Sequence, residues 1–206
     1  SMRATFMPKP FMHLTGNGCH AHVSLWKDGA NAFDDEAGEL GLAQIGYDFI
    51  GGLIHSADAL AAVLNPTVNS YKRINAPRTT SGATWSPNSV TYTGNNRTHM
   101  IRIPEGGRFE LRLADGASNP YLLQAGILAA GIDGLKNKRD PGKRLDINMY
   151  TEGHTVQNTK TLPLNLLDAL RAFEASPILA KAFGAFVPAG FRNSGSWPAG
   201  SSGPGA

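Results

Sequence analysis

Polar and apolar residues alternate between positions 20 and 26, which is the pattern of a β-strand with one face against the core. His20, His22 and Ser24 share the polar face, so we expect them to point away from the core. The segment KDGANAF that follows is typical of a turn. The apolar face, on which we expect a buried and unreactive thiol, carries Cys19, Ala21, Val23 and Leu25.

A second strand with the same alternation is predicted over residues 107–113, GRFELRL. Its polar face carries Arg108, Glu110 and Arg112. The other face is expected to lie in the core and carries Phe109, Leu111 and Leu113.

Helical spacing of apolar residues predicts one helix over residues 40–64, which Gly51-Gly52 weakens and Asn65-Pro66 ends. Between residues 67 and 104 only short strand-like pieces occur, and such a length without a clear period often carries functional loops. Groups of strands followed by helices, without regular β-α-β alternation, indicate the α+β class. Further helices are predicted over 120–138, with Ser118 or Asn119 as its cap and Pro120 in its first turn, and over about 164–175 and 177–183.

The composition favours one globular unit, because 206 residues with 41% hydrophobic content suffice for one sizeable core. A formal charge of +3 is too small to imply binding to nucleic acid or to a membrane, and no apolar run reaches the length of a membrane span. A single cysteine excludes an internal disulfide, so we expect a reducing cytoplasm. We expect residues 1–2 to be a tag scar, 3–189 to form the domain, and 190–206 to be a Gly/Ser/Pro-rich flexible tail.

The two histidines of the HAH segment can both reach one metal ion, although such a pair also occurs on an ordinary solvated strand. No Asp or Glu occurs between residues 74 and 104, so we expect five arginines in and around this stretch to lack local carboxylate partners: Arg73, Arg97, Arg102, Arg108 and Arg112. Unpaired guanidinium groups near a His and Glu pair suggest a phosphate or carboxylate ligand bound with its cation. The sequence has neither GxxxxGK[ST] nor GxGxxG, so ATP would have to bind on a sheet.

Four ordered blocks of this sequence resemble motifs of the glutamine synthetase family: GNGCHAHVSLW, NPTVNSYKR, NNRTHMIRIP and RFELRLADGASNPYL. The resemblance runs from about Met7 to about Tyr150. It implies a C-terminal portion of the catalytic domain, in which antiparallel strands form one wall of an open barrel-like sheet packed by helices. It also implies a ligase that phosphorylates the γ-carboxylate of L-glutamate with ATP and then joins ammonia to it.

The resemblance assigns roles to individual residues. His20 and Glu110 correspond to ligands of a Mg²⁺ or Mn²⁺ ion. The residues that correspond to the glutamate site are Thr15, Gly16, Arg73, Arg97 and Arg112. Those that correspond to the nucleotide site are His22, Val23, Ser24, Arg97, Arg102 and Arg108. Arg97 is expected to bind the phosphates and the transferred phosphoryl group, and thus to be catalytic. For Gly16 and Gly18 we expect a backbone packed against a ligand.

Departures from the family pattern leave the amine open. The segment after Arg73, INAPRTTSGATWSPN, lacks the acidic residue of the ammonia-using forms and is most similar to the subgroup of type III-like glutamine synthetases and glutamate–methylamine ligases. Tyr150 stands where some bacterial forms carry a nucleotidylated tyrosine. The chain is less than half as long as family members, so we expect it to be inactive alone, whereas the full-length form would assemble into a double ring. The alternative of another class is a non-catalytic structural relative.

Overall fold

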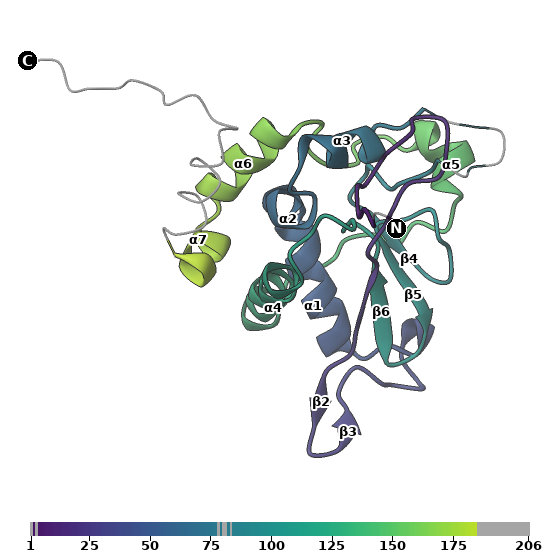
Figure 1. The fold of residues 1–206 in the computed structure, drawn as a ribbon. Helices are drawn as coiled ribbons and strands as arrows, with labels where there is room; N and C mark the ends of the chain where they lie inside the picture. The colour runs from purple at the N-terminus through teal and green to yellow at the C-terminus, as the bar shows by residue number, and fades with distance from the viewer. Residues whose placement is uncertain (1, 3, 78, 80–81, 83, 185–206) are drawn as a thin grey trace, which may run out of the picture.

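The computed structural model describes residues 2, 4–77, 79, 82 and 84–184. Its main sheet has the strand order β1-β6-β5-β4, so β1 lies at one edge (Figure 1). The pairs β1·β6 and β5·β6 are antiparallel, as expected, whereas β4 pairs with β5 in parallel. The strands are β1 (Ala21–Val23), β4 (Tyr92–Thr93), β5 (Ile101–Glu105) and β6 (Arg108–Leu111), with a separate hairpin of β2 (Trp26–Lys27) and β3 (Ala30–Asn31).

Helices cover one face of this sheet (Figure 1). Phe109 and Leu111 of β6 are fully buried beneath them, as the alternation predicted. The α+β class and the absence of a closed barrel among the described residues agree with the expected wall of an open sheet. The helices are η1 (Glu39–Gly41), α1 (Gln44–His55), α2 (Ala57–Leu64), α3 (Val68–Ile74), α4 (Pro120–Asn137), α5 (Met149–Glu152), η2 (Gly153–Thr155), α6 (Leu166–Ala175) and α7 (Pro177–Phe183).

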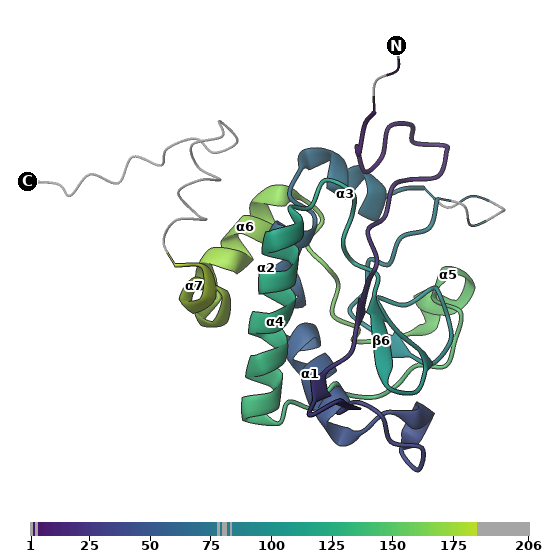
Figure 2. The same cartoon turned by 60° about the horizontal axis from the view of Figure 1, so that its bottom comes forward.

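The single helix expected over residues 40–64 is wrong in one respect, because the chain breaks it at Ser56 rather than weakening at Gly51-Gly52. Ser56 has φ −97° and ψ 8°, which ends α1 and starts α2. The two glycines lie inside α1 and serve its packing: a Cβ on Gly52 would stand 2.0 Å from the carbonyl oxygen of Ala130 in α4. The sequence pattern showed the apolar face but not this close approach of α4, which lies beside α1 in Figures 1 and 2.

The predicted loop region after residue 67 contains a helix, α3, that the apolar pattern did not indicate. The Thr67 side chain accepts a hydrogen bond from the backbone N–H of Ser70, and the Ser70 hydroxyl accepts one from the backbone N–H of Thr67. This capping box fixes the start of α3. Arg73 lies in the last turn of α3 and is thereby held against the sheet.

Two expectations at the chain's N-terminal side have different outcomes. Cys19 is exposed, so the expected burial of its thiol is wrong. The cause is that β1 begins only at Ala21, while Gly18 forms an isolated bridge with Asp115 and residue 19 precedes the regular alternation. Ala21, Val23 and Leu25 do pack against the core.

The expected tail, residues 190–206, and Ser1 of the expected tag scar lie outside the described residues. Within the part that is described, no helix is long and apolar enough to cross a membrane.

Candidate active site

Glu110 lies at the centre of a charged cluster on the sheet face opposite the helices. Strand register places it beside His22 of β1 on one side and Arg102 of β5 on the other. Its side chain is only 5% exposed, with the Arg102 Nε atom 2.6 Å from Oε2. Arg112 Nη1 donates to both carboxylate oxygens, at 3.2 and 3.1 Å. Two guanidinium groups therefore share one buried carboxylate.

Both histidines of the HAH segment reach the same oxygen of Glu110. His20 Nδ1 lies 3.3 Å and His22 Nε2 3.6 Å from Oε1. Arg112 Nη1 lies 3.2 Å from His20 Nδ1, and Arg108 donates to His22 Nδ1. The predicted pairing of His20 with Glu110 thus has a geometric basis, and the geometry brings His22 to the carboxylate as well.

The cluster controls the charge of its members. Burial, and then the nearby Arg112, lower the pKa of His20 to about 4, although Glu110 opposes this. Burial alone would raise the pKa of Glu110, but Arg112 and Arg102 outweigh it and hold that pKa below its ordinary value of 4.5. At neutral pH the site therefore holds a neutral imidazole beside an ionised carboxylate.

The expectation that the five arginines lack carboxylate partners is wrong for three of them. Arg102 and Arg112 pair with Glu110, and Arg108 Nε donates to Glu105 Oε1 at 2.8 Å. The inference failed because the stretch without Asp or Glu ends at residue 104: Glu105 and Glu110 are close in sequence to Arg108 and Arg112. Antiparallel pairing also brings Glu110 opposite Arg102. Arg97 is exposed and pairs with no carboxylate among the described residues.

Arg73 reaches this cluster from α3. It is 5% exposed, and its Nη1 donates to the backbone carbonyl of Leu113 at 3.1 Å. A Cβ on Gly18 would lie 3.0 Å from Arg73 Nη2 and 3.1 Å from His20 Nε2. A glycine at 18 therefore lets a guanidinium group and an imidazole approach the same point of the backbone.

The remaining predicted positions lie around this cluster with differing exposure. Thr15 is exposed, and Gly16 packs against the chain itself, because a Cβ there would stand 2.7 Å from the Pro8 carbonyl oxygen. Ser24 is exposed and its hydroxyl accepts from Trp26 Nε1 at 3.0 Å. The Val23 side chain packs against the core, so only its backbone can face a nucleotide.

Two buried charged residues near Arg73 were not singled out in the sequence. Lys9 is 2% exposed, and its pKa is lowered by burial and by Arg73. Its ammonium group donates to the Leu14 carbonyl, while its backbone N–H donates to the Asn69 side chain. Asp115 is fully buried and accepts from Asn65 at 3.0 Å. Asp115 lies within the RFELRLADGASNPYL block, which was the only signal that could have pointed to it.

His20 and Glu110 suit a divalent cation as two of its ligands. A neutral imidazole and a carboxylate are common donors, and ligand atoms bonded to one ion at about 2.1 Å lie about 3 Å apart, close to the observed separation. Arg112 Nη1 contacts both groups and would have to withdraw from them. Among the described residues no group of three or more His, Cys, Asp or Glu side chains could hold a metal ion.

Comparison with known proteins gives consistent results. The profile of the glutamine synthetase catalytic domain matches residues 1–195. A glutamine synthetase of Rhizobium leguminosarum bv. phaseoli is 66% identical over 186 residues, covering 89% of this chain and 43% of the relative. A glutamate–methylamine ligase of Methyloversatilis universalis is 45% identical over 188 residues, covering 89% of this chain and 42% of the relative.

Two solved structures have the same fold. One, described as a GmaS/ADP complex, is 64% identical with a TM-score of 0.86 and covers 93% of this chain and 44% of its own. The other, described as apo GmaS without ligand, is 60% identical with a TM-score of 0.84, with 93% and 43% covered. The chain thus spans less than half the length of these relatives.

Proposed function

Because this chain belongs to the glutamine synthetase catalytic domain family, we propose that it supplies one wall of the active site of an ATP-dependent carbon–nitrogen ligase. The reaction would join ammonia, or a small amine, to the γ-carboxylate of L-glutamate through γ-glutamyl phosphate. The observation that carries the proposal is the cluster in which Glu110 is buried beneath Arg102 and Arg112, with His20 and His22 at its edge. Such an array of guanidinium groups suits a phosphorylated intermediate.

His20 and Glu110 would hold the divalent cation, which we propose to be Mg²⁺ or Mn²⁺. When bound, the cation would neutralise charge on the phosphate oxygens. The His20 pKa of about 4 keeps the imidazole unprotonated, as a ligand must be. His22, Ser24 and the backbone of Val23 would line the nucleotide.

The arginines would divide the anionic groups of the substrates between them. Arg102 and Arg108 would bind ATP phosphates, and Arg97, which is exposed and without an ion pair among the described residues, would bind the transferred phosphoryl group. Arg73 and Arg112, with Thr15 and Gly16, would bind glutamate. Glu110 would orient Arg102 before substrates arrive, which reduces the reorganisation needed in the transition state.

We further propose that residues 3–189 form a C-terminal portion of the catalytic domain and that the full-length protein assembles into a cytoplasmic double ring. The chain alone would then be inactive, because the described residues offer two of the metal's ligands. The proposal expects no ATP-dependent γ-glutamyl amide formation by the 206-residue chain.

A chimera tests the catalytic role. The parent is the Rhizobium leguminosarum relative, and its segment that aligns with this chain over 186 residues is replaced by the sequence of this chain. We expect the chimera, checked for folding by circular dichroism, to form γ-glutamyl amide from glutamate, ATP and an amine with Mg²⁺ or Mn²⁺. A folded chimera that is inactive beside an active parent would refute the proposal and favour a non-catalytic structural relative.

Substitutions within the chimera locate the chemistry. Arg97→Gln should lower kcat about 10² to 10³-fold, the usual effect of removing a donor that stabilises transition-state charge. Arg171→Gln is the matched control, because Arg171 lies on α6 and is exposed in an ion pair with Asp168. Equal kcat values for the two variants would remove Arg97 from the mechanism.

A second candidate reaction uses methylamine in place of ammonia. The relatives include a named glutamate–methylamine ligase, although it is less similar to this chain than a named glutamine synthetase. The chimera should therefore be assayed with ammonia, methylamine, ethanolamine and a polyamine. The amine with the highest kcat/KM identifies the reaction of the chimera. A preference that differs from that of the parent enzyme would show that the residues of this chain take part in selecting the amine.

A further inference from the structure

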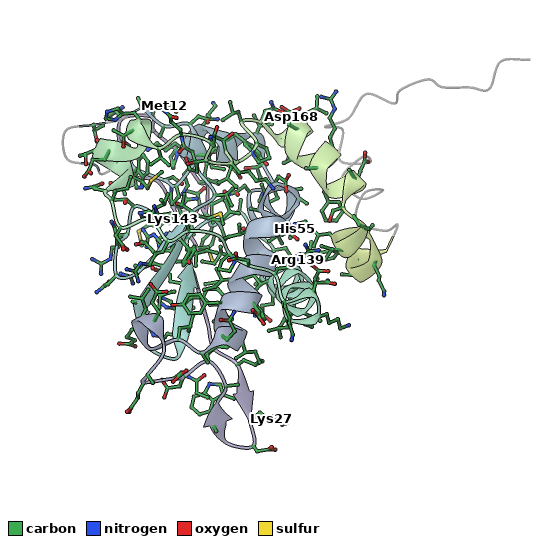
Figure 3. The ribbon with its side chains drawn as sticks, turned by 180° about the vertical axis from the view of Figure 1, so that it is seen from behind. Met12, Lys27, His55, Arg139, Lys143 and Asp168 are labelled. Carbon is green, nitrogen blue, oxygen red and sulfur yellow. The ribbon has the colours of Figure 1, made fainter. Side chains whose placement is uncertain are left out.

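A groove of about 560 Å³ lies between α4 and α7, separate from the charged cluster around Glu110. His55 and Arg139 mark its position in Figure 3. A volume of this size is within the range of small-molecule sites, roughly 300–1,000 Å³. The groove is lined by His55, Ala129, Ile132, Asp133, Lys136, Arg139, Pro177, Ile178, Lys181 and Ala182.

Two helix faces build this groove. Ala129, Ile132 and Lys136 recur at helical spacing on α4, and Ile178 and Lys181 recur in the same way on α7. Ile132 is 43% exposed, so an apolar surface remains open to solvent there. Each helix therefore contributes apolar side chains and one lysine to the lining of the groove.

The charged side chains that line the groove are mostly positive. Arg139 pairs with Asp133, but Lys136 and Lys181 have no carboxylate within ion-pair distance among the described residues. Three cations therefore face one carboxylate that is already paired. Burial, and then Arg139, lower the pKa of His55, so its imidazole is neutral at pH 7 and offers hydrogen bonds rather than charge.

Packing holds the groove in shape. The backbone N–H of Arg139 donates to the Gly134 carbonyl at 3.0 Å, and a Cβ on Gly51 would stand 1.9 Å from the Arg139 carbonyl oxygen. The end of α4 is thus fixed against α1. Ser176 caps α7 by accepting from the Leu179 backbone N–H at 3.3 Å. Such a site needs little reorganisation to bind a ligand.

A second cavity, of about 380 Å³, extends the groove toward α6. It shares His55, Pro177 and Ile178 with the first. Ser56 also lines it, and the buried Ser56 hydroxyl has no hydrogen-bond partner. Because Ile178 lines both cavities, the apolar body of a ligand in the groove would extend along Ile178 into the second cavity.

We propose that the groove between α4 and α7 binds a small organic carboxylate with an apolar body. Its carboxylate would lie between Lys136 and Lys181, and its hydrocarbon part would cover Ile132 and Ile178. The proposal does not rest on the proposed ligase function, because none of these residues belongs to the candidate active site.

The test titrates the full 206-residue chain, labelled at its isoleucine methyl groups, with 4-phenylbutyrate as the probe. We expect the NMR signals of Ile132 and Ile178 to shift and saturate, while the signal of Ile101, which is buried in strand β5, stays in place. 4-Phenylbutanol, which lacks the charge, and acetate, which lacks the apolar body, should each bind at least about tenfold more weakly, since loss of about 1.4 kcal/mol corresponds to tenfold. Equal affinity for either control compound would overturn the proposal.

Variants separate the two lysines from the general positive charge of the chain. Lys136→Met and Lys181→Met keep an apolar side chain and should each weaken binding of 4-phenylbutyrate by about fivefold to tenfold, the effect of a lost charged hydrogen bond at a partly exposed site. Lys143→Met, at an exposed lysine remote from the groove (Figure 3), should leave the affinity unchanged. A spectrum like that of the wild type shows that each variant is folded. No change in affinity in either groove variant, or an equal change in Lys143→Met, would overturn the assignment.

Discussion

At the scale of single residues, Glu110 is the buried carboxylate that pairs with two guanidinium groups of the candidate site. Replacing it with glutamine leaves Arg102 and Arg112, whose side chains are 9% and 12% exposed, without their carboxylate. We expect Glu110→Gln to lower the free energy of unfolding by about 3 kcal/mol, because breaking a buried ion pair leaves an uncompensated charge. Chemical denaturation of the chain measures this.

Glu105→Gln is the matched control on the same hairpin. Glu105 pairs with Arg108, but its side chain is 67% exposed, so the pair contributes about 1 kcal/mol or less. Similar losses of stability in the two variants would show that Glu110 and its arginines act as an ordinary surface pair.

His99 gives a pH dependence that is independent of the candidate metal ligands. It is fully buried, its Nε2 donates to the Ile147 carbonyl at 2.9 Å, and Nδ1 lies 3.0 Å from the Thr91 hydroxyl. Burial lowers its pKa below the ordinary 6.5, despite the opposing effect of Ile147 and Asp146. The unfolded chain then binds a proton more readily than the folded one, so stability falls as pH drops below about 6.5 toward the lowered pKa.

The expected result is seen in a comparison with His99→Gln, which keeps a donor but does not titrate. Between pH 7.5 and pH 5 the stability of the wild type should fall more steeply than that of the variant. The other histidines are present in both proteins, so the difference isolates His99. Parallel stability curves from urea denaturation would contradict a neutral, buried His99.

Prediction from sequence worked well for the faces of residues and poorly for their partners. Alternation placed Glu110 opposite Phe109 and Leu111, and both apolar side chains are buried. The sequence could not show that Arg102 stands beside Glu110, because strand register depends on which strands meet. The exposure of Cys19 was missed for a similar reason, since the first residue of the strand is set by pairing with β6.

At the scale of elements, the contact between α1 and α4 depends on glycines. A Cβ on Gly52 would lie 2.0 Å from the Ala130 carbonyl oxygen and 2.7 Å from the Gly134 backbone nitrogen. Backbone atoms cannot move aside as a side chain can, so we expect Gly52→Ala to destabilise the chain by about 3 kcal/mol. In an exposed helix the same substitution would stabilise by about 1 kcal/mol. Thermal and urea denaturation measure the change.

Gly126→Ala is the control for this prediction, because Gly126 is a buried glycine of α4. A Cβ there would meet the end of the Leu60 side chain at 3.1 Å, and that side chain can shift by a few tenths of an ångström. We expect a change of less than about 1 kcal/mol. An equally large loss in this variant would show that α4 tolerates no added volume anywhere, rather than a specific contact at Gly52.

The ends of some helices could be predicted and those of others could not, because capping signals in the sequence mark only some of them. Asn119 caps α4 with Pro120 in its first turn, and α6 and α7 lie close to the predicted ranges. The division of the first long helix at Ser56 had no such signal, because the apolar spacing continues through it. The helix α3 has only seven residues, too few for a clear period, and depends on its capping box.

At the scale of the whole molecule, the segment before β1 exposes several large apolar side chains. It loops outward at the edge of the molecule near α3 (Figure 2). The exposed fractions are 69% for Phe6, 47% for Met7, 60% for Phe11, 42% for Met12 and 50% for Leu14. Apolar surface gathered in one segment favours association of the chain with itself.

We therefore expect the average mass of the chain in light scattering to rise with concentration. The double variant Phe11→Ser/Leu14→Ser should associate at least about tenfold more weakly, since burial of each such side chain contributes about 1.5–3 kcal/mol. Leu128→Ser is the matched control, because Leu128 is also 50% exposed but lies on α4. If Leu128→Ser weakens association as much as the double variant, the contact involves the helical side instead. A chain that stays monomeric at all concentrations would show that the exposed segment does not drive association. Neither Phe11 nor Leu14 belongs to the charged cluster around Glu110, so the double variant tests the exposed surface of the chain without changing the candidate active site.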